Sequence, residues 1–344
     1  MDIAPLSNGL RPRVIADANI PFLPELLGDS VKLVRLPPAE ITPEAVRDAD
    51  ALITRTRTRC DAHLLDNSRC QFIATATIGT DHIDYPYCHE RGIAVASAPG
   101  CNAPAVAQYV LSSVLRLTGD RNPAELTLGI VGVGHVGSIV ERWGRALGFN
   151  LLLCDPPRAE SEGSDKFATL DEIARRADIV TFHTPHTLDG PHATHHLADK
   201  RFFEAIERRP IIINSARGPI VDTPALIEAI NAGKTGPVVI DCWEGEPDIN
   251  LRLLEKATFA TPHIAGYSAE GKARASLMAA RALCMHFGLP FNPSIPVPAD
   301  APATVSARQL LESYNPAIDT AALRAHPADF EALRNHYPLR PEPK

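Results

Sequence analysis

The chain has 344 residues, a length that favours two or three domains over a single small module. Hydrophobic residues make up 45% and charged residues 22%, a globular composition that excludes general disorder. Asp and Glu (41) outnumber Lys and Arg (34), which argues against a nucleic-acid partner and favours a small-molecule site.

Short apolar runs alternate with amphipathic stretches up to about residue 285, which predicts α/β layers with parallel strands. The strands expected first are RVIAD, ALITRTR, QFIATAT and IAVASAP, with the helical pattern TPEAVRDA among them. A helix over 102–119 leads to a second run of strands, LTLGIVGVGHVG, NLLLCDP, ADIVTFHTP, PIIINSARG and PVVIDCWEGEP. These strands suffice for a doubly wound sheet.

The last part of the chain changes character. A long helix is expected in AEGKARASLMAARALCMHFG, which would return to the first domain. The proline-dense run LPFNPSIPVPADAPATV then predicts a stiff extended arm, followed by short helical pieces such as ADFEALRNHY. We therefore expect a small C-terminal appendage over 291–344.

The sequence contains no recognisable signal for secretion, membrane insertion or disulfide formation. The N-terminal MDIAPLSNGLRPRVIAD lacks the basic and apolar regions of a secretory signal, and no uninterrupted apolar run approaches the roughly 18 residues of a membrane span. Seven scattered cysteines with no C-x-x-C spacing predict free thiols in a reducing cytoplasm.

A glycine-rich turn predicts a dinucleotide site. Gly132, Gly134 and Gly137 form G-x-G-x-x-G between an apolar strand and an amphipathic helix, a spacing that places pyrophosphate on the helix N-terminus. His135 and Val136 lie inside this turn and are further candidates for cofactor contact. The next strand ends in Asp155, which can accept hydrogen bonds from the ribose hydroxyls and would repel a 2′-phosphate. We therefore expect NAD rather than NADP.

Three polar residues follow later strands, at the sheet edge where open α/β sheets bind ligands. Arg217 offers a planar fork for a substrate carboxylate. His263 can act as a general base, and Glu246 would favour its protonated form and fix its tautomer. Each residue alone also fits an ordinary structural role.

The motifs GVGHVG, HTP, NSARG, DCWEGEP and PHIAGYS stand in the order and spacing of the NAD-dependent D-2-hydroxyacid dehydrogenases, which the chain resembles. More narrowly, TATIGTDHID, APGCNAPAVAQYV and PHIAGYSAEGKARA resemble the erythronate-4-phosphate dehydrogenases of vitamin B6 synthesis. This resemblance covers nearly the whole chain and weakens after about residue 290. It implies NAD-dependent oxidation of 4-phospho-D-erythronate to 3-hydroxy-2-oxo-4-phosphobutanoate.

The same resemblance implies roles for individual residues. Arg217, Glu246 and His263 become the catalytic residues. The residues expected to contact the cofactor are Asp155, Thr184, Ala216, Asp241 and Gly266. The substrate contacts are Thr56, Thr77 and Tyr267.

The resemblance also implies an architecture. Residues 1–105 and 266–290 would form a discontinuous flavodoxin-like substrate lobe, and residues 106–265 an inserted Rossmann lobe that binds NAD. The catalytic cleft would lie between the lobes and close to exclude water. Residues 291–344 would supply the arm and a dimerisation segment, although this segment is short for the family. A homodimer is thus expected.

Arg55, Arg57 and Arg59 would share one face of an extended strand, where three adjacent cations suggest a site for the substrate phosphate. The alternative is that they lie beyond the strand end and point into water. Only Arg55 has a clear counterpart in the family pattern, so we assign phosphate contact to Arg55.

The histidines from His183 to His196 match no zinc spacing, and no metal site is expected. Two alternative functions stay open: a related dehydrogenase acting on 3-phosphoglycerate or hydroxypyruvate, and an NAD(H)-sensing corepressor that binds protein partners.

Overall fold

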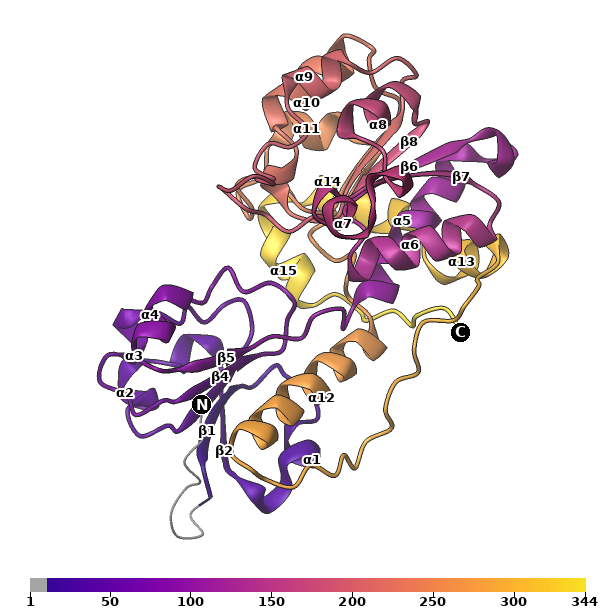
Figure 1. The fold of residues 1–344 in the computed structure, drawn as a ribbon. Helices are drawn as coiled ribbons and strands as arrows, with labels where there is room; N and C mark the ends of the chain where they lie inside the picture. Colours follow the sequence, from indigo (N-terminus) through magenta and orange to yellow (C-terminus); the bar gives the residue numbers. More distant parts are fainter. Residues whose placement is uncertain (1–10) are drawn as a thin grey trace. The chain divides into compact units, whose positions relative to one another are not determined.

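The computed structural model describes residues 11–344, so the first ten residues of the predicted first domain, and the start of the N-terminal segment examined for a signal, lie outside it. The chain forms two compact units (Figure 1). Unit 1 comprises residues 11–102 and Ala269–Asp300, and unit 2 comprises Ala103–Ser268 and Ala301–Lys344. Each unit is therefore assembled from two separate stretches of sequence.

Unit 1 contains a five-stranded parallel sheet with the order β2-β1-β3-β4-β5. Its central strands are buried because they consist almost entirely of apolar residues. The edge strand β2 was not predicted, since its sequence KLVRL is short, carries two charged residues without a regular alternation, and is only partly buried. The strands are β1 Arg13–Asp17, β2 Lys32–Leu36, β3 Ala51–Thr54, β4 Phe72–Thr75 and β5 Ala94–Ala96.

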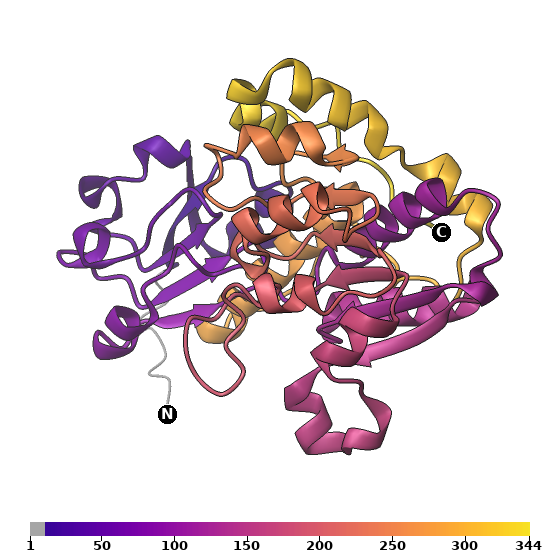
Figure 2. The same ribbon diagram turned by 90° about the horizontal axis from the view of Figure 1, so that it is seen from above.

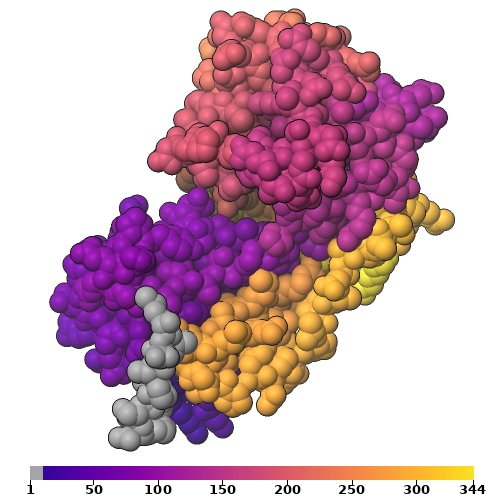
Figure 3. Space-filling model, viewed as in Figure 1, coloured from indigo at the N-terminus to yellow at the C-terminus, as the bar shows by residue number. Residues whose placement is uncertain are grey.

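The helices of unit 1 cover this sheet on its two faces. The long α12, which follows unit 2 in the sequence, packs against β4 and α1. In the space-filling view of Figure 3 the orange residues of this second stretch lie directly against the indigo residues of the first. The helices are α1 Leu23–Leu27, α2 Pro43–Val46, α3 Ala62–Leu65, α4 Tyr85–Glu90 and α12 Ala269–His286.

Unit 2 contains a six-stranded parallel sheet with the order β11-β10-β9-β8-β6-β7. The chain reverses its winding direction between β6 and β8, the point at which such sheets bind ligands. The five predicted strands are present, and the two-residue β11 completes the sheet. The strands are β6 Thr127–Val131, β7 Asn150–Cys154, β8 Ile179–Phe182, β9 Ile211–Asn214, β10 Val238–Ile240 and β11 Phe259–Ala260.

Helices pack on both faces of the unit 2 sheet, as expected of a doubly wound fold. Each is short except for α5, which matches the predicted helix over 102–119, and α6. They are α5 Ala103–Thr118, α6 His135–Ala146, α7 Pro156–Glu162, α8 Leu170–Arg176, α9 Lys200–Glu204, α10 Thr223–Asn231 and α11 Leu251–Lys256, then α13 Ala307–Ser313, α14 Pro316–Ala325 and α15 Phe330–Asn335.

The segment 291–344, which we expected as a separate appendage, is divided between the units. Residues 289–300 contain no helix or strand, and Phe291 and Ile295 pack against the core of unit 1. The three helices after residue 300 belong to unit 2, where α13 packs on α5 and α14 packs on β11. Figure 2 shows these helices in yellow along unit 2. No helix within 11–344 has the length and apolar character required to cross a membrane.

Candidate active site

The turn between β6 and α6 carries the glycine motif, and two of its glycines leave no room for a side chain. Gly132 has a φ of +86°, and a Cβ there would lie 2.8 Å from main-chain atoms of the segment after β8. A Cβ on Gly137 would lie 2.0 Å from the Gly132 carbonyl oxygen. A Cβ on Gly134, in contrast, would meet nothing within 4 Å. The first and third glycines close the turn, and the second exposes main chain to a ligand.

The N-terminus of α6 opens directly from this turn. Gly134 is the N-cap, and no side chain hydrogen-bonds to the first N–H groups of the helix. His135 and Val136 occupy the first turn, and the His135 side chain is exposed. Because the first N–H groups of a helix lack intrahelical partners and lie at the positive end of its dipole, this terminus suits a phosphate group.

Asp155 follows β7 and lies beside the glycine turn, because β7 pairs with β6 up to the partners Cys154 and Val131. Its Oδ2 accepts a hydrogen bond from the Val133 N–H at 2.7 Å. Its Oδ1 accepts from the Arg158 N–H at 3.1 Å and caps α7. The carboxylate thus has the position from which a dinucleotide-binding fold holds the ribose hydroxyls.

Two buried polar atoms after β8 face the same region without a hydrogen-bond partner in the part of the chain that the structure describes. They are Thr184 Oγ1 and His183 Nδ1. The other ring nitrogen, His183 Nε2, lies 3.0 Å from Thr181 Oγ1, and burial lowers the pKa of His183 to about 3. Buried polar groups are normally paired, so these atoms beside the glycine turn fit contact with a polar ligand such as a dinucleotide.

Arg217 lies in the loop after β9. Asn214, the last residue of that strand, donates from Nδ2 to the Arg217 carbonyl oxygen at 2.9 Å and accepts at Oδ1 from the Ala216 N–H at 3.2 Å. The Arg217 guanidinium donates to the Ala216 carbonyl oxygen at 2.8 Å. The loop therefore fixes the base of a half-buried guanidinium that has the geometry to bind a carboxylate.

His263 and Glu246 form the closest ionisable pair of the site, with 2.6 Å between His263 Nδ1 and Glu246 Oε1. The second carboxylate oxygen of Glu246 accepts a hydrogen bond from the Trp243 N–H at 3.2 Å. Burial opposes ionisation of Glu246, but the hydrogen bond and charge of His263 outweigh it and lower the pKa of the carboxyl. An ionised Glu246 fixes the ring orientation and directs Nε2 of His263 away from itself.

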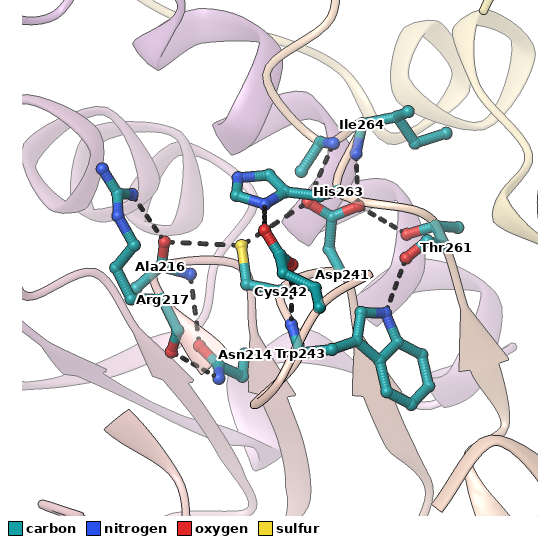
Figure 4. Close-up of polar contacts among 11 residues, drawn as sticks. Asn214, Ala216, Arg217, Asp241, Cys242, Trp243, Thr261, His263 and Ile264 are labelled. Carbon is teal, nitrogen blue, oxygen red and sulfur yellow. Dashed lines mark hydrogen bonds and ion pairs between the residues drawn. The ribbon is translucent and has the colours of Figure 1, made fainter. Parts of the chain in front are cut away.

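Figure 4 shows that the side chains of Arg217 and His263 extend to the same side of their two loops, with the Cys242 sulfur between them. Cys242 donates to the Ala216 carbonyl oxygen at 3.4 Å, and burial raises its pKa well above the ordinary value. The thiol is therefore neutral and structural. The structure thus brings the three predicted catalytic residues of unit 2 into one group at the carboxyl edge of its sheet.

Asp241, a predicted cofactor contact, is fully buried and already bonded on both oxygens. Oδ1 accepts from Thr261 Oγ1 at 2.6 Å and from the Ile264 N–H at 2.8 Å, and Oδ2 accepts from the Ala265 N–H at 3.0 Å. Burial raises the pKa of Asp241. Its evident function here is to hold the loop that carries His263.

Sequence reasoning missed Arg334, which α15 brings close to this group. Its Nε is buried and has no hydrogen-bond partner within the described residues. Burial opposes its charge, but Tyr267 and Glu246 outweigh this effect and raise the pKa of the guanidinium. No motif marks Arg334, because only the packing of the C-terminal helices places it there. Tyr267 and Gly266, both half-buried, lie in the same loop as His263.

The predicted substrate contacts Arg55, Thr56 and Thr77 lie in unit 1, after β3 and β4. The expected arginine face on an extended strand is wrong, because β3 ends at Thr54, opposite the end of β4 at Thr75. The next residues form a turn, and Arg59 pairs with Asp61 at 2.8 Å. Arg55 differs from Arg59 in having a buried Nε without a hydrogen-bond partner among residues 11–344.

The histidines after β8 form a chain of contacts rather than a metal site. His186 Nε2 lies 3.1 Å from His195 Nδ1, and His196 Nε2 lies 2.6 Å from Glu244 Oε1. Within the described part of the chain, no group of three or more His, Cys, Asp or Glu side chains could hold a metal ion.

Comparison with known proteins agrees with this geometry. Residues 114–265 match the model of the D-isomer specific 2-hydroxyacid dehydrogenase NAD-binding domain. The chain is 48% identical to an erythronate-4-phosphate dehydrogenase of Bacteroides thetaiotaomicron over 96% of this chain and 97% of that protein. The chain belongs to the erythronate-4-phosphate dehydrogenase family. A further member, from Porphyromonas gingivalis, is 42% identical over 95% of this chain and 92% of its own length.

Solved structures support the same membership in the wider family. A D-lactate dehydrogenase of Aquifex aeolicus, complexed with NAD and lactic acid, matches with a TM-score of 0.69 and 26% identity over 80% of this chain and 96% of its own. A D-mandelate dehydrogenase of Rhodotorula graminis matches with a TM-score of 0.69 and 27% identity over 80% of this chain and 94% of its own. This member of the erythronate-4-phosphate dehydrogenase family is therefore an NAD-dependent dehydrogenase that acts on a CH–OH group.

Proposed function

We propose that this protein oxidises 4-phospho-D-erythronate at C2 and produces 3-hydroxy-2-oxo-4-phosphobutanoate, a step of vitamin B6 synthesis. The observation that carries the proposal is the 2.6 Å His263–Glu246 pair beside Arg217, in a chain 48% identical to an erythronate-4-phosphate dehydrogenase. NAD, held at the glycine turn, by Asp155 and by Thr184, would supply the acceptor for the hydride that leaves C2.

In this proposal Arg217 binds the substrate carboxylate. Its guanidinium can form two parallel hydrogen bonds with the two carboxylate oxygens, which fixes the orientation of the neighbouring C2. The same positive charge stabilises the partial negative charge on the C2 oxygen as the carbonyl forms. The bond from Nη1 to the Ala216 carbonyl and the bonds of Asn214 hold the arginine loop in place for this task.

His263 would accept the proton of the C2 hydroxyl at Nε2, because Nδ1 is bonded to Glu246. The hydroxyl proton then resides on the imidazole, while the C2 hydrogen leaves with its electron pair as hydride. Glu246 stabilises the positive charge that forms on the ring and keeps Nε2 directed at the substrate. The balance is one proton and one hydride removed for each 2-oxo acid formed.

The deciding experiment compares initial rates of NADH formation with 4-phospho-D-erythronate, 3-phosphoglycerate and an unphosphorylated 2-hydroxy acid. We expect the highest kcat/KM with 4-phospho-D-erythronate under NAD. A higher value with 3-phosphoglycerate would assign the chain to that substrate instead. NAD binding without turnover on any of these acids would favour a sensor that binds protein partners.

The His263→Ala variant tests the assignment of the base. We expect kcat to fall about 100- to 10,000-fold, the usual contribution of a positioned acid or base, with little change in the Kd of NADH. The NADH Kd, measured by fluorescence titration, controls for misfolding of the site. Turnover close to that of the unmodified protein would remove His263 from the mechanism.

We also propose a cytoplasmic homodimer. Within the described residues none of the seven cysteines forms a disulfide bond and all are buried, which agrees with a reducing compartment. Sedimentation equilibrium on the purified protein tests the dimer, and a monomer mass at micromolar concentration would contradict it.

A further inference from the structure

The loop that carries His263 has a main chain that needs support from its surroundings. His263 has a φ of +55°, in the left-handed region that residues other than glycine seldom adopt. Such a conformation is unfavourable for a residue with a Cβ and persists where neighbouring groups fix it. One side of the loop is fixed by the buried Asp241, which accepts from the N–H groups of Ile264 and Ala265.

The carbonyl groups of the same two residues are bonded by a single side chain from the other end of unit 2. Arg340 donates from Nη1 to the Ile264 carbonyl oxygen at 3.0 Å and from Nη2 to the Ala265 carbonyl oxygen. The two residues after His263 thus have their N–H groups bonded to Asp241 and their carbonyl oxygens bonded to Arg340, so the peptide group that joins them is bonded at both ends.

The remaining donors of Arg340 tie this loop to helix α5. Nε donates to Gln108 Oε1 at 2.9 Å, and Nη2 also donates to the Ala105 carbonyl oxygen at 3.1 Å. The guanidinium carbon lies 4.5 Å from the centre of the Tyr314 ring, and the residue is only 6% exposed. A buried arginine surrounded by acceptors in several directions is a rigid cross-link, which the three donors of a lysine ammonium could not reproduce.

Flanking contacts fix the position of Arg340 itself. Gln108 donates from Nε2 to the Pro341 carbonyl oxygen at 3.0 Å, and Ser268 donates from Oγ to Glu342 Oε1 at 2.7 Å. Ser268 and Arg340 also form an isolated parallel β-bridge. The segment 340–342 thus runs alongside the end of the His263 loop and is held to it by main chain and side chain.

We propose that Arg340 is a positioning residue, whose bonds to the Ile264 and Ala265 carbonyl groups hold His263 in the orientation that turnover requires. The inference rests on the proposed function for the role of His263, although the cross-link itself is a property of the fold. Loss of these bonds would let the loop relax from its left-handed conformation and displace the imidazole. Displacements of about 1 Å at a reacting group can reduce turnover by roughly 100-fold.

The test compares Arg340→Met and Arg340→Lys with the matched control Arg324→Met. Arg324, in α14, also donates to main-chain carbonyl groups, those of Leu254 and Ala257, which belong to no predicted site residue. We expect kcat to fall about 10- to 100-fold in Arg340→Met, less in Arg340→Lys, and within about twofold of the unmodified protein in Arg324→Met.

Hydrogen exchange gives a readout that does not depend on the substrate. The amides of Ile264 and Ala265 are buried and bonded, so peptides covering 261–268 should exchange slowly in the unmodified protein and faster in Arg340→Met, but not in Arg324→Met. A kcat of Arg340→Met within about twofold of the Arg324→Met value, or equal exchange in the two variants, overturns the proposal. If Arg340→Met does not fold, Arg340→Lys is judged by the same criteria. If the unmodified protein is inactive on every phosphorylated acid, the proposed function is refuted. The hydrogen-exchange comparison then still tests whether Arg340 holds the loop.

Discussion

Asp155 caps α7, and in the proposed function it is also the acidic group at the ribose position. Arg158 lies close to it, donating to the Val133 carbonyl oxygen at 2.7 Å and pairing with Glu162 at 2.7 Å. An acidic residue here repels a 2′-phosphate, whereas an arginine can bind one. We therefore expect the preference for NAD over NADP to depend on the negative charge of Asp155.

We predict that Asp155→Ser lowers the ratio of kcat/KM for NAD to that for NADP by about 10- to 100-fold, since serine keeps an N-cap oxygen but removes the repulsion. Steady-state rates with both cofactors measure this ratio. Glu160→Ala serves as the control, because Glu160 is an exposed acidic residue of the same helix whose partner is His192 and not Arg158. An unchanged ratio in Asp155→Ser would contradict the assigned role.

His183 makes the stability of unit 2 depend on pH. Its pKa is lowered to about 3 by burial, so the folded protein keeps the ring neutral where the unfolded chain, with an ordinary histidine pKa near 6.5, is protonated. Proton uptake on unfolding means that the stability contributed by the neutral ring is present above about pH 6.5 and is lost as the pH falls towards 3.

Lowering the pH from 7 to 5 should reduce the free energy of unfolding of both proteins. We expect this reduction to be about 2 kcal/mol smaller in His183→Gln, which has no histidine to protonate at this position. Urea unfolding followed by tryptophan fluorescence is suited to this, because the two tryptophans, Trp143 and Trp243, both lie in unit 2. If the free energies of unfolding of the two proteins changed equally with pH, folding would not lower the pKa of His183.

At the scale of elements, the strand ends decide which side chains can bind a ligand. β3 ends at Thr54, which pairs with Thr75 at the end of β4. The turn that follows separates the arginines that a continued strand would align. Arg59 is engaged by Asp61, and Arg55 remains the candidate for a substrate anion.

We predict that Arg55→Ala raises the KM for the phosphorylated substrate about 10- to 100-fold, the usual effect of losing one charge-assisted hydrogen bond. The KM for an unphosphorylated 2-hydroxy acid should change much less. Arg59→Ala is the matched control and should leave both constants unchanged, since its guanidinium is paired with Asp61. Equal increases for both substrates in Arg55→Ala would exclude phosphate contact.

The sequence was sufficient to predict most of the fold and of the candidate site, because glycine spacing and apolar strands are local signals. The turn at Gly132, Asp155 after β7 and the loops of Arg217 and His263 were all placed by such signals. The edge strand β2 was missed because its five residues, two of them charged, show neither a continuous apolar run nor a regular alternation. Arg340 could not be found, since its partner Ala105 lies 235 residues earlier and only tertiary packing joins them.

On the scale of the whole molecule, the C-terminal stretch is part of the core of unit 2. Leu310 and Tyr314 pack in one hydrophobic cluster of this unit, and Leu323 and Phe330 pack in the other. Each of these buried side chains contributes about 1.5–3 kcal/mol, so together they match much of the roughly 5–15 kcal/mol by which a domain is stable.

A chain shortened to end at residue 300 should therefore lose NADH binding and the cooperative unfolding transition of unit 2. Fluorescence titration with NADH and urea unfolding followed by tryptophan emission measure the two properties. A shortened chain that binds NADH with unchanged Kd and unfolds cooperatively would show that residues 301–344 are an appendage after all. Ile318→Ala, which shortens an exposed side chain of α14, is a control that leaves both hydrophobic clusters of unit 2 intact.

Because each unit is formed from two separate stretches of sequence, the order of translation determines when each unit can be completed on the ribosome. Unit 1 needs α12, which is translated only after all strands of the unit 2 sheet. Unit 2 in turn needs Arg340 and Glu342 to bond the loop that carries His263. Neither unit is complete when its sheet has been translated, so the nascent chain must hold two incomplete units until the segments that finish them are made.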